Sequence, residues 1–116
     1  MQTSEIEKAK LLILLELIEY VPNSVISKTI IQKVTGSIRL MAFDYGEALA
    51  EKVSPFDTFI QVIEGSADII IDQIVNSLES GQAIIIPANA PNMVKATRRA
   101  KMISTMIKSG YEGNLM

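Results

Sequence analysis

Short runs rich in β-branched residues, separated by turn-forming residues, fill the sequence from residue 25 onward. Such runs favour extended strands, because branched side chains pack well on a pleated surface and Gly, Pro, Asp and Asn favour turns. No helical segment interrupts the runs, which argues against a parallel sheet with helical crossovers. The pattern predicts an all-β fold of hairpins that close into a barrel or a two-sheet sandwich. We expect strands over residues 25–34, 37–43, 47–53, 58–64, 67–71, 74–78, 83–86, 92–98 and 101–108.

A single domain is the expected organisation of the chain. Its 116 residues and 48% apolar content suit one unit with a hydrophobic core, and two full domains do not fit. We therefore expect one domain over residues 1–116, with the barrel over about 25–108 and a frayed polar tail over 110–116.

One α-helix is expected before the first strand, over residues 3–20. This segment contains no Gly or Pro, Thr3 or Ser4 can cap its start, and Pro22 ends it. Its apolar side chains occupy more than one stripe of a helix, which predicts burial on more than one side. Such a helix would pack over a sheet or dock across a dimer.

The charge balance and two missing residue types exclude several classes of function. Eleven basic and thirteen acidic residues give a net charge of −2, so we expect neither a nucleic-acid nor a membrane partner. The basic residues Lys95, Arg98, Arg99 and Lys101 are expected to form a solvated sheet edge. The chain has no cysteine and no histidine, which removes disulfides, thiolate nucleophiles and imidazole catalysis. We expect a cytoplasmic protein, since no secretory signal is recognisable.

Two segments carry the spacing of paired motifs. The first is GEALAEKVSPFDTFIQVIEG over residues 46–65, and the second is GQAIIIPANAPNMVKA over residues 81–96. Both resemble the two motifs of the cupin family, with Gly46, Gly65, Gly81 and Pro87 at the positions that shape the turns. The resemblance covers about residues 37–108 and implies a small single-domain cupin of the cupin 2 conserved barrel type. It implies a jelly-roll β-barrel and a homodimer.

The same comparison of motifs shows where the chain departs from the family. The family's four metal ligands, three histidines and a glutamate, fall on Lys52, Ser54, Thr58 and Asn92. A lysine ammonium has no lone pair, and hydroxyl and amide groups are weak ligands for transition metals. We therefore expect no bound metal and no cofactor. Asn89 replaces a motif glycine and tolerates the left-handed backbone that the turn requires.

The barrel mouth is the candidate site. Strand alternation directs the four substituted residues into the lumen together with apolar neighbours. We predict a ligand site for a small molecule, such as a carboxylate with an apolar body, formed by Lys52, Ser54, Thr58, Ile60, Val62, Asn92 and Val94. The alternative is a lumen filled by these side chains, with Lys52 reaching solvent and the hydroxyls bonded to backbone.

Two other functions stay open at this point. A metal-free enzyme of isomerase or lyase type would use Lys52 with the nearby carboxylates Asp44, Glu47, Glu51 and Asp57. The other alternative is a non-catalytic structural or interaction barrel. The binding protein is the leading hypothesis, because a reactive lysine requires a desolvation that the sequence does not reveal.

Overall fold

The computed structural model describes residues 5–111, and it is built almost entirely of antiparallel strands. All nine predicted strands are confirmed, with their ends within two residues of the predicted ones. The strands are β1 (Val25–Lys33), β2 (Gly36–Phe43), β3 (Ala48–Lys52), β4 (Asp57–Glu64), β5 (Ser66–Ile71), β6 (Ile74–Glu79), β7 (Ala83–Ile86), β8 (Asn92–Ala96) and β9 (Ala100–Ile107).

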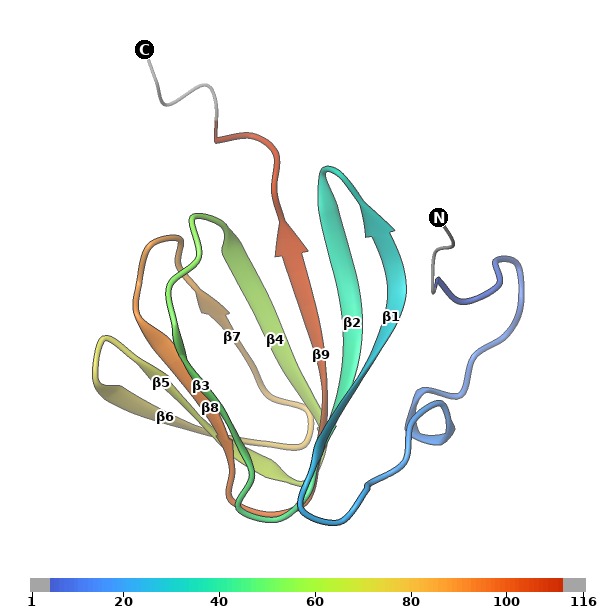
Figure 1. Ribbon diagram of the computed structural model, residues 1–116, viewed down its shortest axis with the longest axis horizontal. Helices are drawn as coiled ribbons and strands as arrows, with labels where there is room; N and C mark the ends of the chain where they lie inside the picture. The colour runs from blue at the N-terminus through green and yellow to red at the C-terminus, as the bar shows by residue number, and fades with distance from the viewer. Residues whose placement is uncertain (1–4, 112–116) are drawn as a thin grey trace.

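Two sheets face each other. The five-stranded sheet has the order β1-β2-β9-β4-β7, and the four-stranded sheet has the order β3-β8-β5-β6. Figure 1 shows that the sheets approach each other at one end of the molecule and diverge at the other. We call these the closed end and the open end. This is the all-β arrangement that the strand pattern predicts, and it has the jelly-roll form that the resemblance of the two motifs implies.

The hydrophobic core lies between the sheets. Its largest fully buried side chains include Phe43, Val62, Ile69 and Met102, which come from both sheets. Each lies on the inward face of its strand, which side chains reach at every second position. The core therefore holds the sheets together and leaves the open end free to carry polar side chains.

The turn residues of the two motifs adopt the backbone conformations expected of them. Gly46, Gly65, Gly81 and Asn89 have positive φ angles of 77°, 81°, 89° and 70°. Gly65 is also constrained by space, because a Cβ at this position would lie 1.8 Å from the backbone oxygen of Arg99. A side chain is thus excluded at residue 65 for two independent reasons.

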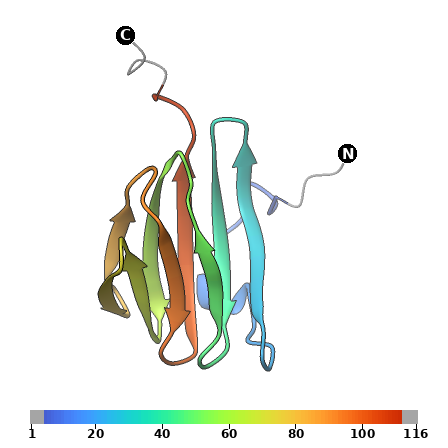
Figure 2. The ribbon, with the colours of Figure 1, turned by 60° about the vertical axis from the view of Figure 1, so that its left-hand side comes forward.

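The predicted helix over residues 3–20 is wrong. Within the described part of this segment, only Leu14–Glu16 form a helical turn, of 3-10 type, and Ala9 has a positive φ of 63°. The segment instead runs along the outer face of the five-stranded sheet (Figure 2), and its last part packs on that face through Leu17, Ile18 and Tyr20. Tertiary packing overrides helix propensity here, because propensity supplies only tenths of a kcal/mol per residue.

Contacts with the outer face fix the end of this segment. Ile18 packs against Leu40 and Ala42, and Lys101 Nζ donates a hydrogen bond of 2.5 Å to the backbone oxygen of Leu15. Lys101 is only 7% exposed, so the prediction of a solvated basic edge is wrong at this residue. Lys101 is buried because the N-terminal segment covers this part of the sheet and accepts a hydrogen bond from its ammonium group.

β9 ends at the open end, and the chain after it contacts the loop before β4. The backbone N–H of Asp57 donates to the Tyr111 hydroxyl at 2.5 Å, and the rings of Tyr111 and Phe56 meet edge to face with centroids 5.7 Å apart. Most of the predicted frayed tail, residues 112–116, lies outside the described residues. Within residues 5–111, no helix is long and apolar enough to cross a lipid bilayer.

Candidate functional site

A cavity of about 450 Å³ lies between the sheets at the open end. Its walls come from β1, β2, β4, β7 and β9 on one side and from β3 and β8 on the other. Its deeper part is lined by the apolar side chains of Val25, Met41, Leu49, Ile60 and Val94, whereas the apolar Ile86 and Met106 pair with Thr58 nearer the open end. The volume falls in the range of small-molecule sites.

Six of the seven predicted site residues line this cavity. They are Lys52, Ser54, Thr58, Ile60, Asn92 and Val94, and they come from both motifs. Val62 does not line it: this residue is 1% exposed and packs in the core between the sheets. Val62 lies one alternation step beyond Ile60 on the inward face of β4, where it pairs with the buried Met102.

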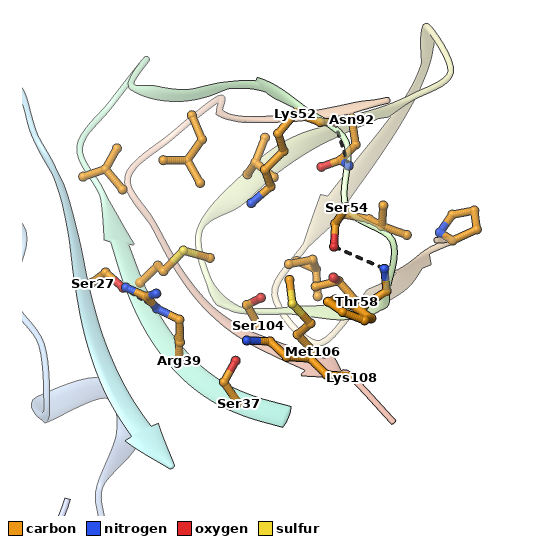
Figure 3. Close-up of a pocket in the computed structure, with 18 of the residues that line it drawn as sticks. Ser27, Ser37, Arg39, Lys52, Ser54, Thr58, Asn92, Ser104, Met106 and Lys108 are labelled. Atoms are coloured by element: carbon orange, nitrogen blue, oxygen red, sulfur yellow. Dashed lines mark hydrogen bonds between the residues drawn. The ribbon is translucent and has the colours of Figure 1, made fainter. Parts of the chain in front are cut away.

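Three cationic side chains line the cavity. Lys52 comes from the four-stranded sheet, whereas Arg39 lies on β2 and Lys108 follows β9 on the other sheet, so positive charge faces the cavity from both walls (Figure 3). Arg39 donates to the Ser27 hydroxyl at 2.8 and 3.0 Å. Within residues 5–111, none of the three has a carboxylate partner within 4.0 Å, and no carboxylate lines the cavity.

Hydroxyl groups surround these cations. The lining includes Ser27, Ser37, Ser54, Thr58 and Ser104. The Ser54 hydroxyl accepts a hydrogen bond of 3.2 Å from the backbone N–H of Phe56, drawn as a dashed line in Figure 3, and it keeps its own proton for donation. The cavity thus combines cations, neutral donors and an apolar wall.

Sequence reasoning missed Arg39, Lys108 and three of the serines. The signal that could have found them is period-two alternation on β2 and β9, where Ser37, Arg39 and Met41 share one face, as do Ser104 and Met106. The motif spacing concerns only β3, β4, β7 and β8. A prediction based on the motifs alone therefore missed the cavity-lining residues of β1, β2 and β9.

Asn92 is the most buried polar residue of the site, at 3% exposure. Its side-chain Nδ2 donates to the backbone oxygens of Ala90 at 3.0 Å and Lys52 at 3.3 Å. Because both neighbours of Nδ2 are acceptors, the amide is oriented unambiguously. Its Oδ1 has no hydrogen-bond partner among the described residues.

The four carboxylates near the first motif lie outside the cavity. Asp44 binds Arg99 at 2.9 Å and accepts a hydrogen bond from the backbone N–H of Asn23. These contacts lower the pKa of Asp44 to about 2, and the hydrogen bond from Asn23 has the largest effect. Asp57 accepts from the backbone N–H of Ala88 at 2.8 Å, and neither Glu47 nor Glu51 lines the cavity. None of the four is placed to act with Lys52 on a molecule in the cavity.

The residues at the family's metal positions do not fit a transition metal. The structure brings Lys52, Ser54, Thr58 and Asn92 to one cavity, as the motif spacing implies. An ammonium repels a divalent cation, and the hydroxyl and amide groups are weak neutral ligands. Among the described residues there is no group of three or more His, Cys, Asp or Glu side chains that could hold a metal ion.

Comparison with solved structures identifies the fold. A conserved protein of unknown function from Streptococcus pyogenes aligns over 91% of this chain and 93% of its own, with 28% identity and a TM-score of 0.86. A cupin superfamily protein from Desulfitobacterium hafniense aligns over 92% and 97%, with 24% identity and a TM-score of 0.82. A cupin 2 conserved barrel domain protein from Leptotrichia buccalis aligns over 81% of this chain but 46% of its own, with 27% identity and a TM-score of 0.78.

The chain has the fold of cupin superfamily proteins. The resemblance of the two motifs to the cupin family is thereby confirmed. The histidine ligands are absent because the chain contains no histidine. No protein-family model and no curated protein matches the sequence. The similarity establishes the barrel fold, but a fold does not define a function, which depends on the residues that line the cavity.

Proposed function

We propose that the protein binds a small carboxylate with an apolar body in the barrel cavity, without a metal. The observation that carries this proposal is the set of three cations, Arg39, Lys52 and Lys108, that face an apolar cavity with no carboxylate partner among the described residues. Like charges facing one space repel each other, and an anion between them removes that repulsion.

The proposed pose follows from the layout of the walls. The carboxylate lies among the cations at the open end, where charge-assisted hydrogen bonds are available from Lys52 and Arg39. The apolar body lies against Met41, Ile60 and Val94, and burial of its surface contributes about 25 cal/mol per Å². Binding therefore depends on both ends of the ligand.

Titration calorimetry with 4-methylpentanoate tests the proposal. We expect binding to the wild type, about tenfold weaker binding to Lys52→Met, and a loss of affinity at high ionic strength. Lys95→Met is the matched control, because it removes the same charge from an exposed residue outside the cavity and should change affinity less than about twofold. Absence of binding, or equal losses in both variants, would remove the cavity from the proposal.

The metal-free part of the proposal has its own measurement. Elemental analysis of the purified protein should show no stoichiometric transition metal, and a chelator should leave the affinity for 4-methylpentanoate unchanged. Stoichiometric metal whose removal abolishes binding would contradict this part.

The enzyme hypothesis receives no support from the geometry. It requires a carboxylate that can act with Lys52, and the four candidates lie outside the cavity. A non-catalytic interaction barrel is distinguished by the same titration, because such a barrel has no reason to bind the acid.

We also propose that the protein is a homodimer formed through the outer face of the five-stranded sheet. The strand registers place Ile31, Ile38, Thr105, Phe59 and Ile85 in one row across all five strands. Phe59 is 38% exposed and Ile85 60%, and the nearby N-terminal segment exposes further apolar side chains. Four of the five side chains in this row are apolar, and burial of their exposed surface in a dimer is favourable.

Multi-angle light scattering tests the dimer. We expect a mass near twice the 12.7 kDa of the chain, and a shift to one chain in the double variant Phe59→Asp and Ile85→Asp. Val75→Asp is the control, since Val75 is 55% exposed but belongs to the four-stranded sheet. A monomeric wild type would refute the proposal.

A further inference from the structure

The unpartnered Oδ1 of Asn92 restricts the chemistry of the ligand further than the three cations do. Asn92 is 3% exposed, and its Nδ2 is fixed between two backbone carbonyls, so Oδ1 cannot exchange places with it. A buried acceptor without a donor costs free energy. Since Asn92 lines the cavity, we assign its Oδ1 a hydrogen-bond donor from the ligand.

The position of this acceptor relative to Lys52 restricts which donor fits. Lys52 and Asn92 are directly opposite each other in the antiparallel pair β3–β8, which places their Cβ atoms about 5 Å apart. In Figure 3 both side chains project into the cavity from the same wall. One ligand that reaches both side chains therefore carries its anionic group and its hydrogen-bond donor on neighbouring atoms.

The charge of the cavity selects the type of donor. An ammonium group on the ligand would meet Arg39, Lys52 and Lys108, with no carboxylate in the lining to offset the repulsion. A hydroxyl is neutral, donates one hydrogen bond, and leaves the attraction between the carboxylate and the cations intact.

Resting on the proposed carboxylate site, we infer that the ligand is a 2-hydroxy carboxylate, whose carboxylate binds Lys52 and whose hydroxyl donates to Asn92 Oδ1. The apolar remainder of this ligand lies against the deep wall at Ile60 and Val94. The acceptor is fixed on one wall, so the site distinguishes the two enantiomers. Loss of the ligand hydroxyl leaves Oδ1 buried and unpaired, which is the basis of the preference.

Calorimetry on a matched series of acids tests this inference. The probes are 4-methylpentanoate, each enantiomer of 2-hydroxy-4-methylpentanoate, and 2-methoxy-4-methylpentanoate, which keeps an oxygen but has no proton to donate. We expect one hydroxy enantiomer to bind about tenfold more tightly than the parent acid, and the methoxy acid to gain nothing. In Asn92→Ala the parent acid should still bind, and the hydroxyl preference should fall below about twofold.

The outcomes separate this inference from the proposed function. Equal affinity for parent and hydroxy acids would overturn the inference and leave the carboxylate site standing, as would happen if Lys52 itself donates to Asn92. A preference that the methoxy acid shares would also overturn it. No binding of any acid would overturn both proposals. The wild-type series decides these cases even if Asn92→Ala does not fold.

Discussion

Cations on the two sides of the five-stranded sheet have opposite surroundings. On the outer face, Lys101 donates to the Leu15 backbone oxygen and lies 5.0 Å from the centre of the Tyr20 ring, and Arg99 binds Asp44. In the cavity, Arg39, Lys52 and Lys108 have no carboxylate partner among the described residues. The first set is satisfied by the chain itself, whereas the second set has its positive charge left for another molecule.

The satisfied set explains how the N-terminal segment is held. We call Tyr20, Glu64, Arg99 and Lys101 the outer-face cluster. Tyr20 donates a hydrogen bond of 2.5 Å to Glu64, and burial together with this carboxylate raises the pKa of the Tyr20 hydroxyl, so it keeps its proton. The cations Arg99 and Lys101 lie over the ring of Tyr20. This cluster contributes to stability, and the cavity cations are available for binding.

The largest expected effect comes from Gly65→Ala, which disturbs the backbone beside the outer-face cluster. The new Cβ would collide with the Arg99 carbonyl at a residue with positive φ, so we expect a loss of about 3 kcal/mol or more in the free energy of unfolding. Urea denaturation measures it. Gly81→Ala is the control: its φ is also positive but nothing lies within 4 Å, and we expect a loss of about 1 kcal/mol. Equal losses would refute the steric explanation.

Removal of one cation from each side tests the comparison directly. Lys101→Ala should lower the free energy of unfolding by about 2 kcal/mol, because it removes a hydrogen bond, a ring contact and a buried stem. Lys52→Ala should change it by less than about 0.5 kcal/mol, because its side chain is exposed. If the order were reversed, the assignment of the two sets to stability and binding would be wrong.

A smaller effect is expected from Tyr20→Phe. This variant keeps the ring under Arg99 and Lys101 but removes the hydroxyl that binds Glu64, so about 1 kcal/mol of unfolding free energy should be lost. Thermal and urea denaturation should agree, and acid binding in the cavity should stay the same. A change in affinity would show that the two faces are coupled.

The smallest effect is confined to acidic pH. The pKa of Asp44 in the folded protein is about 2, below its usual value near 4, so its contribution is present above that usual value. The contribution is lost as the pH falls from about 4 towards 2. Asp44→Asn should therefore flatten the decline of stability over this range, measured by urea denaturation at stepped pH. An unchanged decline would mean that other carboxylates control it.

The strands and their turns were predictable because their causes are local. Alternation and β-branching specify the nine strands, and Gly46, Gly65 and Gly81 supply the positive φ angles that the turns require. The motif spacing also placed Lys52 and Asn92 correctly at the cavity.

The wrong predictions share one physical cause, which is that each depended on contacts between segments that are distant in the chain. Residues 3–20 have good helix propensity, but contacts with Leu40, Ala42 and Lys101 outweigh it. Val62 has the correct alternation, yet how deep the cavity reaches depends on how the two sheets diverge.

By itself, the sequence determined which segments are strands, where they turn, and that no histidine is present to bind a metal. Only the tertiary structure decided that Arg39 and Lys108 join Lys52 around one cavity while Lys101 faces the opposite side of the sheet. Period-two alternation assigns each side chain to one of two faces, but which face encloses the cavity depends on pairing between strands distant in the chain.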